Sequence, residues 1–128
     1  MTSIQTKSSS RSILSGLAIV MVLAGTAVPA AAKGPAYIGT WATSAKACKL
    51  PPDTLDAPVV MTARAYNQFE THCDFKSIKK VGSVWTAAAK CLVTGAVEKD
   101  TLKITASTKT MSLKWNSAPG ALRFVRCK

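Results

Sequence analysis

The fold is decided by residues 69–93, FETHCDFKSIKKVGSVWTAAAKCLV. In its first half, Phe69, Thr71, Cys73 and Phe75 alternate with charged and polar residues, so these four side chains share one face. After a turn around Gly82 the alternation resumes, and one face of the second half carries Trp85, Ala87, Ala89, Cys91 and Val93. Because a period of two residues is typical of a strand with one buried face, this stretch predicts an antiparallel β-hairpin.

Similar alternation is found on both sides of this hairpin. It predicts strands at residues 37–42 and 58–62 upstream, and at 101–106, 110–115 and 122–127 downstream. The segment 44–58 is irregular, with Pro51 and Pro52 interrupting it, and it has room for a helical turn. We therefore expect an all-β antiparallel meander of six to seven strands, forming a curved sheet, a small barrel or a sandwich. Closure is attractive because it removes exposed strand edges.

The N-terminus has the three parts of a secretory signal peptide. Lys7 and Arg11 precede an apolar segment at 13–28, and the alanines at 30–32 offer an A-x-A cleavage site before Lys33. We expect residues 1–32 to be removed and 33–128 to form a single domain in the periplasm or the medium. An uncleaved anchor is disfavoured, because an apolar segment of this length falls short of the roughly 20 residues that span a bilayer.

The four cysteines, Cys48, Cys73, Cys91 and Cys127, all follow this signal. An even number in a small exported domain indicates two disulfides, and the lack of a Cys-x-x-Cys spacing argues against redox catalysis and zinc binding. Cys73 and Cys91 would be directly opposite in a hairpin symmetric about Gly82. However, Cys48 in the long loop also needs a partner, and Cys127 is well placed to pin a terminal strand. Of the three possible connectivities we expect Cys48–Cys73 and Cys91–Cys127.

Positive charge is distributed unevenly along the chain. Residues 33–128 hold 15 Lys and Arg against 6 Asp and Glu, for a net charge of +9. Residues 33–75 are electroneutral, so the whole excess lies in residues 76–128, where eleven basic residues face only Glu98 and Asp100. Such asymmetry can mark attraction to an anionic partner. Because the lysines are scattered rather than massed, the simpler interpretation is that the charge keeps a small exported protein soluble.

Lysines flank two of the predicted hairpins and are the candidate anion-binding residues: Lys76, Lys79, Lys80, Lys90, Lys103, Lys109 and Lys114. If these hairpins are neighbours, the seven ammonium groups share one surface, and lysine suits diffuse anions better than bidentate recognition. We expect a monomer that binds an anionic glycan or lipid of the cell envelope, or an acidic exported protein. Export argues against nucleic acid as a partner.

Few residues point to catalysis. The single histidine, His72, lies on a polar strand face between Glu70 and Asp74. These three side chains could hold a metal weakly, but a solvated charged face explains them more simply. The sequence has no nucleophile elbow and no glycine-rich phosphate loop. We therefore expect neither enzyme activity nor a cofactor.

A short motif at the first predicted strand carries a family resemblance. Gly39-Thr40-Trp41 opens that strand, and Arg123 and Arg126 lie in the last one. This resembles the G-x-W start of lipocalins and their calycin relatives, in which the tryptophan packs near an arginine of the closing strand. The resemblance implies that Trp41 is buried against Arg123 or Arg126.

A wider arrangement covers most of residues 33–128. The G-x-W strand is followed by Glu70-Thr71-His72-Cys73, by a tryptophan before Cys91, and by a terminal Arg126-Cys127 pair. This order resembles small uncharacterised periplasmic proteins of α-proteobacteria, and the resemblance implies no activity.

A second class of function is a proteinaceous inhibitor of an exported enzyme. Small disulfide-linked β domains present rigid loops well, and the suspected loop is Lys49-Leu50-Pro51-Pro52 within the irregular segment. The positive net charge argues against a basic target and leaves an acidic one open.

Overall fold

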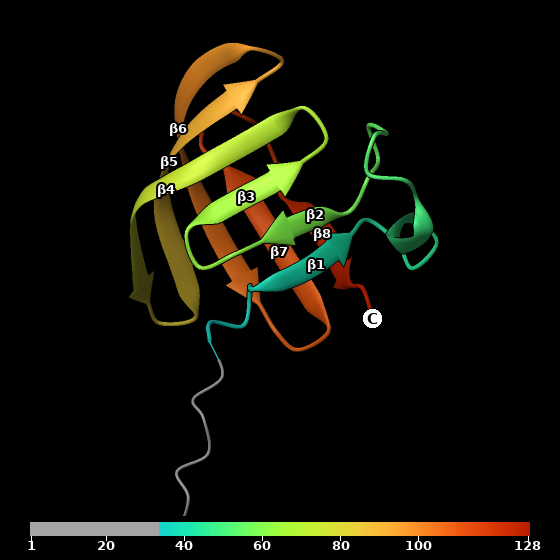
Figure 1. Ribbon diagram of the computed structural model, residues 1–128. Coiled ribbons are helices and arrows are strands. Elements are labelled where there is room, and N and C mark those ends of the chain that lie inside the picture. Colours follow the sequence, from blue (N-terminus) through green and yellow to red (C-terminus); the bar gives the residue numbers. More distant parts are fainter. Residues whose placement is uncertain (1–33) are drawn as a thin grey trace, which may run out of the picture. The chain divides into compact units, whose positions relative to one another are not determined.

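A computed structural model describes residues 34–128, which form a closed eight-stranded barrel (Figure 1). Every strand is antiparallel to the next in the chain, and the last pairs with the first. The strands are β1 (Gly39–Ala42), β2 (Val59–Met61), β3 (Ala65–Gln68), β4 (Thr71–Val81), β5 (Val84–Val93), β6 (Ala96–Ala106), β7 (Thr110–Trp115) and β8 (Leu122–Arg126). The predicted all-β antiparallel meander is confirmed, with eight strands instead of six or seven. The predicted signal peptide lies outside the described residues.

The additional strand is β3, which the sequence did not reveal. It pairs with β2 on one side and with β4 on the other, where Gln68 is opposite Thr71. Phe69 and Glu70 form the turn between β3 and β4, and Phe69 has a φ of 34°. Phe69 therefore lies in a turn, although its place in the alternating pattern predicted that it belonged to the strand.

Two tight turns complete the long central hairpins. Val81 pairs with Val84 across a turn whose first residue, Gly82, has a φ of 60°, as the sequence predicted. At the end of β5, Thr94 and Gly95 have φ values of 45° and 86°. Two successive positive φ angles are typical of a type I′ turn, whose twist matches that of the flanking strands.

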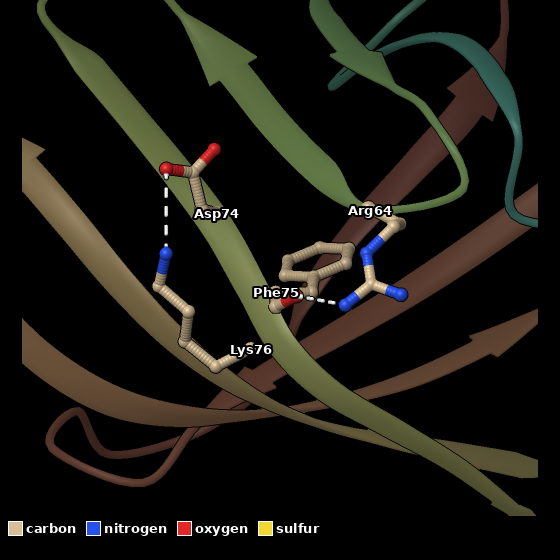
Figure 2. Close-up of polar contacts among 4 residues, drawn as sticks. All are labelled: Arg64, Asp74, Phe75 and Lys76. Carbon is tan, nitrogen blue, oxygen red and sulfur yellow. Dashed lines mark hydrogen bonds and ion pairs between the residues drawn. The ribbon is translucent and has the colours of Figure 1, made fainter.

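A β-bulge in β4 sets the register of the β4–β5 hairpin. One register holds for the pairs from Val81–Val84 to Ser77–Ala88. The next pair is Phe75–Ala89, so Lys76 is an extra residue without a partner on β5. Such a bulge bends the strand and increases its twist. Arg64 Nη2 donates to the carbonyl oxygen of Phe75 at 3.3 Å (Figure 2). The Phe75 amide donates to the Arg64 carbonyl at 2.8 Å. These bonds fix the bulge to the β2–β3 turn.

The bulge also brings two cysteines into register. Cys73 is directly opposite Cys91 and bonded to it, while Cys48 is bonded to Cys127. The predicted pairing of Cys48 with Cys73 and of Cys91 with Cys127 is therefore wrong. If Lys76 paired with Ala89 and the strand had no bulge, Cys73 would face Leu92, the residue after Cys91. Two disulfides indicate that the domain folds in an oxidising environment.

Apolar side chains fill the inside of the barrel. Large side chains that are almost fully buried come from six of the eight strands and from the segment before β1: Tyr37, Trp41, Met61, Phe75, Leu102, Ile104, Met111, Leu113 and Phe124. Trp41 is completely buried, and its Nε1 donates to the Tyr37 carbonyl at 2.8 Å. The Arg126 guanidinium lies 4.1 Å from the Trp41 ring, so the expected arginine contact is present and is made by Arg126.

Candidate functional site

Lysines gather on the outer side of strands β4 to β7. Successive side chains of a strand point to opposite sides, so residues paired across strands share a side. Lys90 is directly opposite Lys99 on β6, and Lys103 of β6 is directly opposite Lys114 of β7. We define the basic face as the exposed lysines on this outer side: Lys76, Lys79, Lys90, Lys99, Lys103 and Lys114.

The basic face contains five of the seven lysines that the sequence suggested. Lys80 instead lies on the same side of its hairpin as Trp85, with its Nζ 4.7 Å from the ring centroid. Lys109 lies in the turn between β6 and β7. The two hairpins are neighbours in the barrel, as the prediction required, because β5 pairs with β6.

Sequence reasoning missed Lys99, which belongs to the basic face. The strand was expected to begin at Thr101, but β6 begins at Ala96. Lys99, Thr101 and Lys103 are spaced by two residues and therefore share a side of β6. This spacing was the available signal, and it was overlooked because the residues around Lys99 are not apolar.

Acidic partners are scarce on the basic face. Within residues 34–128 the single ion pair joins Lys76 and Asp74 at 3.8 Å, and both side chains are well exposed (Figure 2). Asp74 also lies opposite Lys90. An exposed pair of this kind contributes little stability, at most about 1 kcal/mol. Asp74 is therefore in the same cross-strand row as Lys90 and Lys99, whereas the row of Lys103 and Lys114 contains no acidic residue.

The surface is hollowed between the two lysine pairs. The largest depression there has a volume of about 450 Å³. Three lysines, Lys76, Lys90 and Lys99, line it together with Ala88, Ala89, Thr101, Asn116 and one acidic residue, Asp100. A small depression beside it, of about 50 Å³, is lined by Thr101, Lys103, Lys114 and Asn116. The small side chain of Ala88 leaves room that a larger residue would fill. The hydroxyl of Thr101 and the side-chain amide of Asn116 add neutral donors. Ammonium groups around a hollow with such donors suit an anionic group such as a phosphate.

Exposed apolar side chains adjoin the lysines at one end of the basic face. Leu92 of β5 is directly opposite Val97 of β6, and their exposed fractions are 44 % and 62 %. They occupy the outward row next to Lys90 and Lys99, close to the tip of the β5–β6 hairpin at the top of Figure 1. The basic face therefore ends in an apolar tip, which we define as Leu92 and Val97.

His72 makes a local contact rather than a metal site. One ring nitrogen, Nδ1, lies 3.1 Å from the Asn67 side-chain oxygen on β3. Within residues 34–128, no group of three or more His, Cys, Asp or Glu side chains is arranged to hold a metal ion. The described part of the chain also has no helix long and apolar enough to cross a membrane.

The chain was compared with known proteins at three levels. No family model, no curated protein and no solved structure matches it.

Proposed function

We propose that the protein is an exported, non-enzymatic protein of the bacterial cell envelope that binds anionic lipid through its basic face. The periplasm or the medium is its proposed location. The two disulfides and the N-terminal sequence support export. An acidic glycan is the other anion that the lysines suit, and the experiment below separates the two.

The observation that carries the proposal is that two pairs of lysines lie directly opposite each other on neighbouring strands. Lys90 is opposite Lys99, and Lys103 is opposite Lys114. Like charges directly opposite on a sheet destabilise it, whereas opposite charges contribute roughly 0.2–1 kcal/mol per pair. Residues that break a local folding rule without a structural gain are characteristic of functional sites.

The apolar tip supports a lipid rather than a soluble polyanion. A lysine near an anionic bilayer surface contributes roughly 1 kcal/mol, and each buried methylene adds about 0.8 kcal/mol. Leu92 and Val97 lie in the row next to Lys90 and Lys99, so both kinds of contact can form at once. Acyl chains give exposed Leu and Val side chains a continuous apolar surface to bury against, whereas the surface of a hydrated polysaccharide is mostly polar.

Vesicle sedimentation tests the proposal with a charge-matched pair of variants. The triple variant Lys90→Gln, Lys99→Gln and Lys103→Gln should bind phosphatidylglycerol-containing vesicles about 100-fold more weakly than the wild type at low salt. The control triple, Lys46→Gln, Lys49→Gln and Lys109→Gln, removes the same charge away from the basic face. It should weaken binding only a few-fold.

Three results would overturn this proposal. Equal weakening by both triples would mean that only net charge matters. Failure of the wild type to bind anionic vesicles even at low salt would exclude anionic lipid as the ligand of the basic face. Retention on an anionic polysaccharide column together with no vesicle binding would assign the face to glycan.

A specific observation also favours the inhibitor as a second candidate. The loop between β1 and β2 is bonded through Cys48 to Cys127, contains the 3₁₀ turn η1 (Ala47–Lys49), and leaves Leu55 79 % exposed. A cross-linked loop with an exposed apolar residue suits insertion into a cleft. If this function is correct, Leu50→Asp together with Leu55→Asp should abolish inhibition of an exported hydrolase and leave vesicle binding unchanged.

A further inference from the structure

One end of the barrel is hollowed by a cavity of about 250 Å³. It lies between β3, β4, β5, β6 and the residues that follow β7, and we call it the barrel mouth. The residues that matter for its chemistry are Tyr66, Glu98, Asp100, Trp115 and Ser117, with the Cys73–Cys91 disulfide beside them. Ligand pockets for drug-sized molecules start at about 300 Å³, so this volume suits a smaller molecule.

The charge of the barrel mouth is opposite to that of the basic face. Glu98 and Asp100 are the only two carboxylates among residues 76–128, and both line the mouth. Glu98 is opposite Cys91 and Asp100 is opposite Ala89, whose side chains face the barrel interior. Lys99, between them, points to the outer side. Alternation along β6 thus places negative charge inside the mouth and positive charge outside.

Asp100 is held in its ionised form by a set of donors. Its Oδ1 accepts a hydrogen bond from the Thr101 amide at 2.7 Å, and its Oδ2 accepts one from the Ser117 amide at 3.3 Å and another from the Ser117 hydroxyl. Burial raises the pKa of Asp100, but these hydrogen bonds and one from the Asn116 amide outweigh it and lower the pKa below its ordinary value. Asp100 is therefore negatively charged at neutral pH.

Two aromatic rings form another wall of the mouth. Tyr66 and Trp115 pack edge to face, with ring centroids 5.6 Å apart and an interplanar angle of 84°. The Tyr66 hydroxyl donates to Gln68 Oε1 at 2.7 Å, and burial raises the pKa of Tyr66 to about 12, so the ring stays neutral. Trp115 is only partly buried. An indole face attracts a cation most strongly when the cation is partly desolvated.

From this geometry we infer that the barrel mouth is a binding site for a small organic cation, such as an alkylammonium or arylammonium ion. Glu98 and Asp100 supply the negative charge, and Trp115 and Tyr66 supply an apolar wall that an ammonium-bearing molecule can contact. No ion pair neutralises either carboxylate within residues 34–128. The site adjoins the basic face, because Asp100 also lines the depression there, but its ligand has the opposite charge.

Titration followed by NMR tests this inference with benzylammonium as the probe. The indole N–H signal of Trp115, identified by its loss in Trp115→Phe, should shift on addition of benzylammonium with a Kd of about 1 mM or tighter. Benzyl alcohol and benzoate have the same ring without the positive charge, and they should bind at least tenfold more weakly. The indole signals of Trp41 and Trp85 should not move.

Glu98→Gln tests the charge without disturbing the hydrogen bonds of Asp100. It should weaken benzylammonium binding about five- to tenfold, whereas Lys99→Gln, on the outer side of the same strand, should not weaken it. Equal binding of the three probes, or an unchanged Kd in Glu98→Gln, would overturn the inference. Both variants remain assayable on vesicles, so failure here is distinguishable from failure of the lipid proposal.

Discussion

Arg126 connects three separate parts of the chain through one side chain. Its guanidinium lies 4.1 Å from the Trp41 ring and donates to the carbonyls of Ile38 at 2.9 Å and Thr108 at 2.8 Å. Gly39 has a φ of 143°, and a Cβ at that position would collide with the same guanidinium. The glycine, the tryptophan and the arginine therefore depend on one another.

Substitutions at these residues should reveal this dependence. Trp41→Ala should lower the free energy of unfolding by about 3–5 kcal/mol, as large aromatic core deletions do, in urea denaturation followed by circular dichroism. Arg126→Met should also destabilise the domain, because it removes the donor of the partly buried Ile38 carbonyl and the cation beside Trp41. The matched control Arg123→Met changes an exposed arginine of the same strand. If both arginine variants lose the same stability, the contact with Trp41 contributes nothing.

The Ser117 hydroxyl should make stability depend on pH through Asp100. A carboxyl whose pKa is lowered by folding stabilises the fold at pH values above the pKa that it has in the unfolded chain. This contribution is lost as the pH falls through the folded-state pKa. Ser117→Ala removes one donor and should therefore lower the melting temperature at pH 7. The difference from the wild type should shrink as the pH falls below 3.8, the ordinary value for this carboxyl. A difference that stays constant down to pH 2 would contradict this role.

Among the elements, the β4–β5 hairpin accommodates one extra residue, Lys76, between its turn and Cys73. Deleting Lys76 should leave Cys73 opposite Cys91, because Phe75–Ala89 would then directly follow Ser77–Ala88 in a regular register. Alkylation and mass spectrometry of the deletion variant should detect no free thiol. Inserting one alanine after Lys76 should instead place Cys73 opposite Leu92, on the wrong side of its partner strand, and leave two free thiols. An insertion variant that retains the Cys73–Cys91 bond would show that the register is set elsewhere.

The elements differ in how far the sequence could predict them. Strands β4, β5 and β7 alternate between core and solvent, and the sequence pattern identified them. Strand β3 was missed because it is four residues long and half of it is polar, Asn67 and Gln68. The first part of β6 was missed because its inward positions hold Glu98 and Asp100, which line the barrel mouth instead of the apolar core.

The register of the strands explains why the disulfide pairing and the placement of Lys80 on the basic face were predicted wrongly. The pairing of cysteines depends on a bulge of one residue, and the sequence pattern around Lys76 does not reveal it. The same sensitivity to a single position separates Lys79, on the basic face, from Lys80, which packs on Trp85. The candidate lysines could be predicted as a group, but assigning each one to a side required the register.

For the whole molecule, closure of the barrel determines where ligands can bind. The interior is filled by side chains such as Trp41, Phe75 and Leu102, each no more than 2 % exposed. The positions that remain are the outer side, with the basic face, and the barrel mouth, with its two carboxylates. The two proposed sites thus carry mostly opposite charge and meet at Asp100, which lines both. Variants at Lys103 and at Glu98 test them separately, because each of these residues lines only one of the two hollows.

Paramagnetic relaxation in nanodiscs tests whether the basic face binds an anionic bilayer with its apolar tip inserted. With spin-labelled acyl chains in phosphatidylglycerol nanodiscs, the methyl signals of Leu92 and Val97 should broaden strongly. Val60, which has the same 44 % exposure as Leu92 but lies on β2, should keep its signal. Equal broadening of Val60 and Leu92, or no broadening of either, would rule out insertion of the apolar tip.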